Sequence, residues 1–208
     1  VFVGPRIIPS GPSISSTHGD ASAPPYPGGV QVNGPDAIRE AVRVNIRNGA
    51  GIIKIVADVL DRDEIKSAIE TAHSFGIPVT AHSSEKAARI AVELGIDCIE
   101  HGYGLSDETI QLMAEKGTFY DPTIVCNLSA EYIAEREQKI AELDLKEADE
   151  IIAGRTKVAF IDERTPDWAL NQRNILRKAV KAGVRVLTGG DGTPVGEQVL
   201  LEIEQQVL

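Results

Sequence analysis

The 208-residue sequence has few cysteines, a deficit of basic residues and no long apolar run, and each shortage excludes a class of protein. Cys98 and Cys126 stand in no metal-binding pair and cannot build a disulfide scaffold, which is typical of a reducing, cytoplasmic location. The 21 basic and 31 acidic residues give a net charge of −10, which disfavours a nucleic-acid partner. No apolar run reaches the ~18 residues of a membrane helix, and the first residues lack the pattern of a signal peptide. We therefore expect no nucleic-acid and no membrane partner.

The sequence does contain the composition and the repeat pattern of an α/β domain. Apolar, β-branched segments alternate with amphipathic segments that end in glycine, as in βα repeats around a parallel sheet. Strands are predicted over residues 3–9, 52–56, 78–82, 97–101, 118–124 and 184–188. Helices are predicted over residues 35–48, 63–75, 84–94 and 106–116. The predicted fold class is therefore α/β.

Two segments break this alternation. Residues 11–34 are rich in glycine, proline and serine, and they predict a long loop of the kind that often serves function. Residues 129–182 predict a helical excursion, including a helix over residues 170–182, whose charge-rich pattern is typical of a solvated segment or a contact in a homo-oligomer. The chain also begins inside an apolar run without Met and ends in a helical pattern, so we expect it to be part of a longer protein.

Ionisable residues lie within or directly after four of the predicted strands. Lys54 lies within a strand, His82 and His101 end the next two, and Asp191 follows the last. In a parallel barrel the carboxyl ends of the strands meet at one face, so these four side chains should converge. Because His82 and His101 are one βα repeat apart, both imidazoles should project at the same level, as two ligands of one metal ion require.

Four segments of the sequence resemble the metal-dependent amidohydrolase superfamily, in the imidazolonepropionase-like branch that includes Xaa-Pro dipeptidases. The segments are NGPDAIREAVRVNIRNGAGIIKI, PVTAHSSEKAARIAVELGIDCIEHGYGLSDETIQLMAEKG, DPTIV and LTGGD. The resemblance implies a (β/α)8 TIM-type barrel in which a carbamylated lysine of the fourth strand bridges two divalent metals. It implies that the fifth and sixth strands each supply a histidine and that the eighth supplies an aspartate.

By this resemblance the metal ligands are Lys54 as a carbamate, His82, His101 and Asp191, with zinc as the expected metal. The implied activity is hydrolysis of amide C–N bonds, in dipeptides or cyclic amides, by metal-activated water. Asp191 is then also the catalytic general base, which accepts the proton of the water and passes it to the leaving amine. The expected partner is therefore a small-molecule or dipeptide substrate.

The sequence also departs from the family pattern. The family places an HxH pair on the first barrel strand, where it and the aspartate hold one of the two ions, and this sequence contains no HxH. We therefore expect a single partial domain over residues 1–208 that corresponds to strands three to eight, without the first two strands and the C-terminal part of the barrel. The segment VADVLDRDE replaces the glycine-rich turn that commonly follows the strand-four lysine, and Ser84 replaces the second histidine of the AHxH pattern.

Two further residues are candidates for substrate binding. His18 lies in a loop that reaches over the substrate in relatives, and Tyr103 occupies a position that can touch the substrate carboxylate in the family. A loop histidine is often idle, and a tyrosine at this position can serve packing alone. His73 lies near the end of a predicted helix and receives no functional role.

Two other functions remain open from the sequence. Lys54 could form a Schiff base, or the TGGDGT segment could cradle a phosphate, but neither interpretation explains the two strand-end histidines. The chain could also be a non-catalytic partial domain, because a barrel without two of its strands has open sheet edges.

Overall fold

The computed structural model describes residues 6–17, 29–142, 165–191 and 195–207 of the chain. The chain divides into two compact units, Val1–Phe119 and Tyr120–Leu208. None of the helices within the described ranges is both long enough and apolar enough to cross a membrane. The assignment of residues 1–208 to one partial barrel domain remains a prediction.

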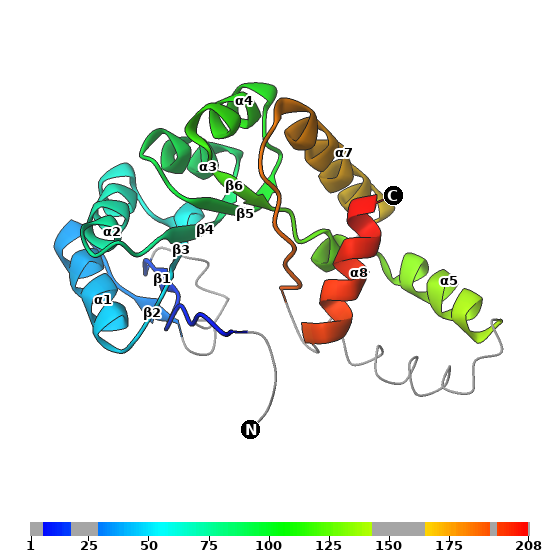
Figure 1. Cartoon of the computed structure of the whole chain (residues 1–208), viewed down its shortest axis with the longest axis horizontal. Coiled ribbons are helices and arrows are strands. Elements are labelled where there is room, and N and C mark those ends of the chain that lie inside the picture. Colours follow the sequence, from blue (N-terminus) through cyan, green and yellow to red (C-terminus); the bar gives the residue numbers. More distant parts are fainter. Residues whose placement is uncertain (1–5, 18–28, 143–164, 192–194, 208) are drawn as a thin grey trace. The chain divides into compact units, whose positions relative to one another are not determined.

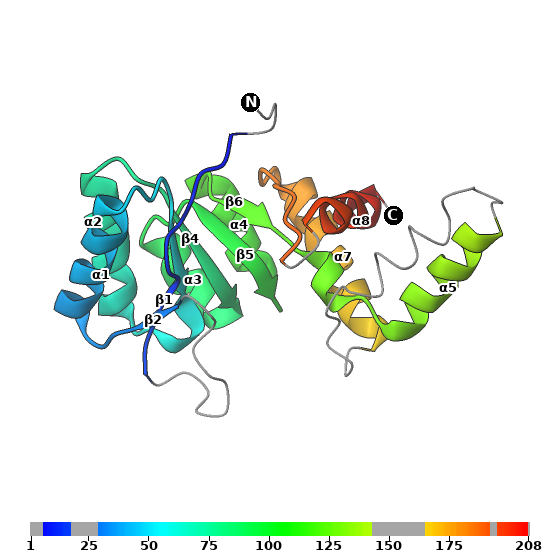
Figure 2. The same cartoon turned by 90° about the horizontal axis from the view of Figure 1, so that it is seen from below.

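The first unit consists of a parallel sheet with helices on one of its faces (Figures 1 and 2). Its strands are β1 (Ile14–Ser15), β2 (Val30–Gln31), β3 (Ile53–Val56), β4 (Val79–Ser84) and β5 (Cys98–Tyr103), and β6 (Phe119–Asp121) contains the boundary between the units. The strand order is β2-β1-β3-β4-β5-β6, and all pairings among β1 to β5 are parallel. The predicted α/β class is therefore confirmed.

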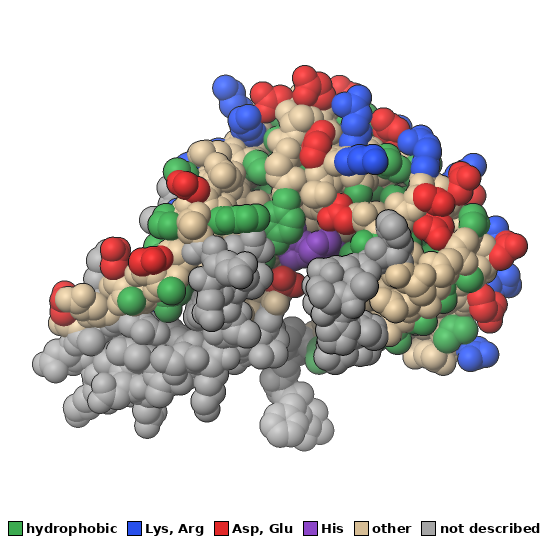
Figure 3. All heavy atoms as spheres, turned by 180° about the vertical axis from the view of Figure 1, so that it is seen from behind, with side chains coloured by type: hydrophobic (Ala, Val, Ile, Leu, Met, Phe, Trp, Pro, Cys, Tyr) green, Lys and Arg blue, Asp and Glu red, His purple; other side chains and the backbone are tan. Residues whose placement is uncertain are grey.

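The helices follow the strands in the predicted alternation. They are α1 (Pro35–Arg47), the short 3₁₀ helix η1 (Ala57–Val59), α2 (Arg62–Ser74), α3 (Glu85–Glu93) and α4 (Asp107–Lys116). The four predicted α-helices are thus confirmed, each within one residue at either end. Acidic and basic side chains are interspersed over the helical surface in the upper part of Figure 3.

Fully buried and partly exposed residues alternate along β3. Ile53 and Ile55 are 0% exposed, whereas Lys54 between them is partly exposed. Ala81 in β4 and Ile99 in β5 are also 0% exposed. Because successive side chains of a strand point to opposite faces, the apolar set packs against the helices and Lys54 lies on the opposite face.

Carboxylates in the first turns of neighbouring helices accept hydrogen bonds at the starts of α1 and α4. Gly34 N, before α1, donates to Glu64 Oε1 (2.7 Å), and Ser106 N, before α4, donates to Glu85 Oε2 (2.8 Å). Asp61 and Glu64 form a capping box at the start of α2. Each acid accepts an N–H group at the amino-terminal end of a helix, where the helix dipole also favours negative charge. The helices are therefore linked to one another at the edge of the sheet where the strands end.

The first strand begins later than predicted. Of the predicted strand over residues 3–9, residues 3–5 lie outside the described ranges, and residues 6–9 form no strand, although Pro9 O accepts a hydrogen bond from Gly51 N (2.9 Å). Strands β1 and β2 lie inside the segment predicted as a loop. Ile14 pairs with Ile55 of β3 and is 0% exposed. Pro9 and Pro12 explain the shift, because proline has no N–H group to donate to a neighbouring strand.

The strand predicted over residues 118–124 is shorter than expected and ends at Asp121. Pro122 follows, and Thr123 has a left-handed backbone (φ 44°) that ends the extended conformation. The chain then forms the short 3₁₀ helix η2 (Ile124–Asn127).

The last predicted strand, over residues 184–188, is reduced to one parallel bridge between Tyr120 and Val186. Tyr120 N donates to Arg185 O (2.9 Å), and Leu187 N donates to Tyr120 O (2.8 Å). The parallel direction agrees with the prediction, but β6 offers too few residues to extend the pairing.

The second unit is mainly helical. It contains η2, α5 (Ala130–Ala141), α7 (Pro166–Ala182) and α8 (Val195–Val207). The helical excursion predicted over residues 129–182 contains α5 and α7, and its residues 143–164 lie outside the described ranges, so the excursion as a whole stays a prediction. Helix α7 begins earlier than the predicted residue 170 because Pro166 stands at a favourable first helical position.

A buried acid lies between α8 and η2. Glu202 is 0% exposed, and its Oε2 accepts a hydrogen bond from Val125 N (2.8 Å). Burial raises the pKa of Glu202 from its usual 4.5 to about 7, although hydrogen bonds from the backbone act in the opposite direction. The second unit therefore contains a carboxyl group that titrates near neutral pH.

Candidate metal centre

Three of the predicted site residues lie on neighbouring strands of the first unit. Lys54 is the second residue of β3, whereas His82 and His101 lie in the carboxyl-terminal halves of β4 and β5. The ring centroids of His82 and His101 are 4.4 Å apart, with the rings inclined by 62°. The structure therefore brings the two imidazoles together, as their spacing predicted, while their assignment as metal ligands remains a prediction.

His101 reaches this position through an unusual backbone conformation. Strict alternation would place its side chain on the helix-facing side together with Ile99. The backbone of His101 is left-handed (φ 62°), and the pairing with β4 shifts register between Ser83 and Ser84. This conformation costs a non-glycine residue roughly 1–3 kcal/mol and is often found at functional sites. The local distortion directs the buried imidazole toward His82.

Lys54 forms an ion pair with Glu100, a residue to which the sequence analysis gave no role. The side chains of both residues are about one-fifth exposed, at 21% and 20%. Thr80, on the intervening strand β4, donates a hydrogen bond from Oγ1 to Glu100 Oε1 (2.8 Å). The pair accounts for an amine on an otherwise apolar strand. Glu100 could have been found from the alternation, since it points to the same face as Lys54.

Tyr103 also contacts the histidines. Its ring stacks on that of His101, with centroids 5.3 Å apart and planes inclined by 6°, and lies 6.1 Å from the ring of His82. Tyr103 therefore lies beside the histidine pair, where a substrate residue would be expected. His18, the other candidate for substrate binding, lies outside the described residues.

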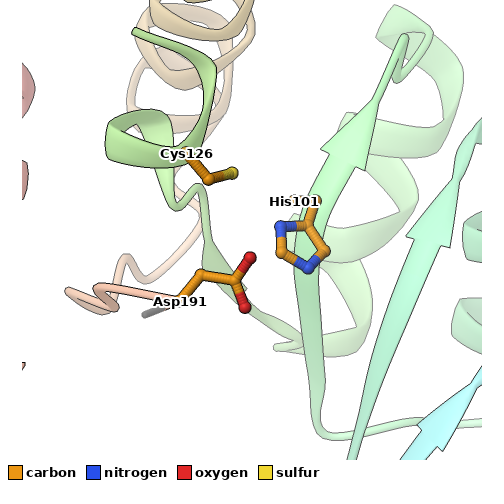
Figure 4. A group of neighbouring side chains, drawn as sticks. All are labelled: His101, Cys126 and Asp191. Carbon is orange, nitrogen blue, oxygen red and sulfur yellow. The ribbon is translucent and has the colours of Figure 1, made fainter. Parts of the chain in front are cut away.

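Asp191 belongs to the second unit and has a left-handed backbone (φ 49°). Figure 4 draws its carboxylate with Cys126 of the same unit and with His101 of the first. A carboxylate oxygen of Asp191 and the Sγ of Cys126 lie within 4.8 Å of each other. From the sequence, Cys126 is expected to stand in no metal-binding pair. Its proximity to Asp191 follows only from the fold, because Cys126 and Asp191 are far apart in the chain. Carboxylate and thiolate are both ligands of zinc, so this pair adds donors to the second unit.

Two glycines before Asp191 permit its local backbone path. A Cβ atom on Gly189 would lie 2.2 Å from Asp121 Oδ2, and one on Gly190 would lie 2.8 Å from Gln198 Cβ. Either Cβ atom would force a neighbour to move, and for Gly189 that neighbour is the end of a side chain. Close packing within the second unit therefore favours glycine at both positions before Asp191.

His73, which received no function from the sequence, has a structural role. Its Nε2 lies 2.8 Å from Asp97 Oδ2, and the same carboxylate oxygen accepts a hydrogen bond from Val79 N (2.8 Å). These contacts join the end of α2 to the start of β4.

The donors of the first unit suit a divalent metal ion. In a tetrahedral zinc site two ligating nitrogens lie about 3.3 Å apart, and imidazole rings at the observed centroid distance can present their nitrogens at that spacing. A carboxylate also lies near each histidine. Glu100 directly precedes His101 in the chain, and Asp58 Oδ2 lies 3.7 Å from His82 Nε2. Nitrogen and oxygen donors of this kind fit zinc and similar metals.

Comparison with known proteins gives consistent similarities. The model of the Amidohydrolase family matches residues 1–207. The ochratoxinase of Aspergillus niger is 28% identical over 234 residues, which cover 96% of this chain and 45% of that protein. Its crystal structure superposes with a TM-score of 0.71 at 23% identity, covering 100% of this chain and 52% of its own.

Two further relatives extend the comparison. The crystal structure of a Xaa-Pro dipeptidase with bound methionine in its active site has a TM-score of 0.66 and 25% identity, covering 98% of this chain and 53% of its own. An uncharacterised protein of Mycobacterium tuberculosis is 43% identical over 108 residues, which cover 46% of this chain and 29% of that protein. The chain thus spans about half the length, or less, of these relatives. Together with the parallel α/β sheet, this supports the predicted partial barrel.

Proposed function

This chain belongs to the amidohydrolase family, and from that premise we propose that it supplies the metal-binding and proton-transfer residues of an enzyme that hydrolyses amide C–N bonds. The observation that carries the proposal is the pair of imidazoles on adjacent strands, with ring centroids 4.4 Å apart. An ion pair or a structural hydrogen bond would need only one of these histidines. Two imidazoles near the carboxyl ends of adjacent parallel strands are well placed to bind the same metal ion.

The residues proposed to hold the metal are His82, His101, Lys54 as a carbamate, and Asp191. Zinc is the proposed metal because the donors are imidazole nitrogens and carboxylate-type oxygens. Bound zinc lowers the pKa of a coordinated water to about 7 and polarises a carbonyl oxygen, which allows hydrolysis at neutral pH.

Asp191 is proposed to move the proton in this reaction. As general base it accepts a proton from the attacking water, and as general acid it then donates that proton to the nitrogen of the leaving amine. Tyr103 is proposed to contact the substrate, which its position beside both imidazoles supports. His18 is proposed to contact the substrate from its loop, on the basis of the family resemblance alone.

Dipeptides and cyclic amides are the proposed substrates. The Xaa-Pro dipeptidase among the structural relatives supports a dipeptide, and a small-molecule substrate is also consistent with the ochratoxinase. The test uses the protein in full, as its gene encodes it, loaded with zinc in the presence of bicarbonate. Release of free amino acids from a panel of Xaa-Pro dipeptides, lost on chelation and restored by zinc, is the expected result. Absence of hydrolysis across dipeptides and five-membered cyclic amides, in a protein that retains zinc, would contradict the proposal.

A further inference from the structure

Asp58 occupies a fixed position beside the histidine pair. It lies in η1, directly after β3, and both of its carboxylate oxygens accept hydrogen bonds from Ser84 N (2.8 and 3.1 Å). Its Oδ1 also accepts a hydrogen bond from Ser84 Oγ (2.8 Å). Its Oδ2 lies 3.7 Å from Nε2 of His82. Both carboxylate oxygens are therefore held by the end of β4, and Oδ2 also faces an imidazole.

The contact joins two places where the sequence departs from the family pattern. Asp58 lies in VADVLDRDE, the segment that stands where a glycine-rich turn is common, and Ser84 stands where the pattern has a second histidine. The two substituted segments meet in space and share hydrogen bonds.

We propose that Asp58 is a positioning residue of the metal centre, which fixes the orientation and the tautomer of His82. At 3.7 Å the carboxylate oxygen lies beyond hydrogen-bond distance of Nε2, but its negative charge favours a proton on that nitrogen. This leaves the lone pair of Nδ1 available for a metal ion. This role rests on the proposed function, because it takes His82 to be a metal ligand. It assigns to Asp58 the part that carboxylates play behind many metal-bound histidines.

The surroundings of Asp58 suit this role. Its side chain is 27% exposed and that of His82 is 29% exposed, so both lie in a partly water-excluded position where a charge contact is stronger than at the surface. Ser84 precedes α3 yet makes no side-chain cap with that helix, and its hydroxyl is instead committed to Asp58. The arrangement therefore aims one carboxylate oxygen at His82 instead of strengthening the start of α3.

Asp58→Asn is the variant that separates this role from a structural one. The amide oxygen of asparagine can keep both hydrogen bonds that Oδ1 accepts from Ser84. An NH₂ group replaces Oδ2, which faces His82 and also accepts the longer, 3.1 Å bond from Ser84 N. Ser84→Ala is the matched control, because it removes the hydroxyl bond but keeps the backbone bonds and the carboxylate beside His82. Thermal unfolding of both variants checks that the fold is retained.

Two measurements on the 208-residue chain test the proposal. In metal-free, ¹⁵N-histidine-labelled protein, two-bond ¹H–¹⁵N correlations report the tautomer of each of the four histidines, with His82 assigned from a His82→Gln variant. We expect a proton on Nε2 of His82 in the wild type and in Ser84→Ala, and a mixture of tautomers in Asp58→Asn. Zinc affinity, measured by competition with a chelator, should fall about 10–100-fold in Asp58→Asn and less than about threefold in Ser84→Ala.

A wild-type His82 protonated on Nδ1, or an Asp58→Asn variant with unchanged tautomer and zinc affinity, would overturn the role of Asp58. Equal losses of zinc affinity in Asp58→Asn and Ser84→Ala would overturn it too, since they would reflect the link to β4 alone. The tautomer measurement needs neither metal nor activity. It therefore decides the role of Asp58 even if no hydrolysis is found and the proposed function fails.

Discussion

Lys54 and Glu100 form an ion pair although their strands, β3 and β5, are not neighbours. Strand β4 lies between them, and its Thr80 donates a hydrogen bond to Glu100 (2.8 Å). The Glu100 carboxylate thus attracts the Lys54 side chain while that side chain is a cationic amine, and it would repel the same side chain as an anionic carbamate. The carbamate of Lys54 therefore needs a positive charge nearby, whereas the amine does not.

We predict that a carbamate forms on Lys54 only when bicarbonate and a divalent metal are both present. Without metal, a carbamate next to the Glu100 carboxylate would place two negative charges together, which is unfavourable at this partly buried position. The measurement is ¹³C NMR of the chain in ¹³C-bicarbonate with and without zinc, with Lys54→Gln as the blank. A carbamate resonance of full intensity without metal would contradict the prediction, and in Glu100→Gln we expect some carbamate even without zinc.

The pKa of Glu202 predicts a stability that falls as the pH rises. Burial raises this pKa from 4.5 to about 7, so the folded chain binds a proton that the unfolded chain has released between these pH values. The contribution is fully present below about pH 4.5 and is lost by about pH 7, and its size is roughly 3 kcal/mol.

Urea unfolding at pH 5 and pH 8, compared between the wild type and Glu202→Gln, measures this contribution. Because glutamine does not titrate and can still accept the hydrogen bond from Val125 N, we expect the variant to lose less free energy of unfolding between the two pH values. Equal pH dependence in the two proteins would show that Glu202 is ionised throughout.

Substitution can separate the proposed proton transfer by Asp191 from the proposed metal binding by Lys54. Asp191→Asn should lower amide hydrolysis by about 10²–10⁴-fold while most metal is retained, because the proton acceptor is lost but the other ligands remain. Lys54→Ala should lose metal as well as activity. Turnover by the full protein and elemental analysis of the same samples provide the measurements. Wild-type turnover in Asp191→Asn, after contaminating hydrolases are excluded, would remove Asp191 from the mechanism.

Much of the first unit could be predicted from the sequence because its signals are local. Glycine-terminated helices and apolar strands gave β3 to β5 and α1 to α4, and the spacing of His82 and His101 predicted that they meet. The predicted strand over residues 3–9 was wrong because apolar character alone does not reveal which N–H groups find a partner. Pairing with Ile55 selected Ile14 instead.

The parts of the site that the sequence did not predict depend on contacts between distant residues. The ion pair of Lys54 with Glu100 and the bonds of Asp58 to Ser84 join residues from different βα repeats. The left-handed backbone of His101 is equally invisible in the sequence, because no glycine or asparagine at that position signals it. Such features follow from the register of the sheet, which is set by the whole fold.

The absence of an HxH pair predicts the metal content of the 208-residue chain. In the family pattern that pair and the aspartate hold one ion, whereas the two later histidines hold the other and the carbamate bridges both. If the proposed ligands hold an ion, Lys54 as a carbamate, His82 and His101 would supply three donors to it, whereas Asp191 alone would not retain a second one. We therefore expect at most one tightly bound divalent metal per chain and little hydrolysis by this chain alone. Elemental analysis after extensive dialysis, with and without bicarbonate, measures the stoichiometry, and His82→Gln should reduce it toward zero. Two retained metals per chain would show that other donors complete a second site. Cys126 would be the first of these donors to substitute.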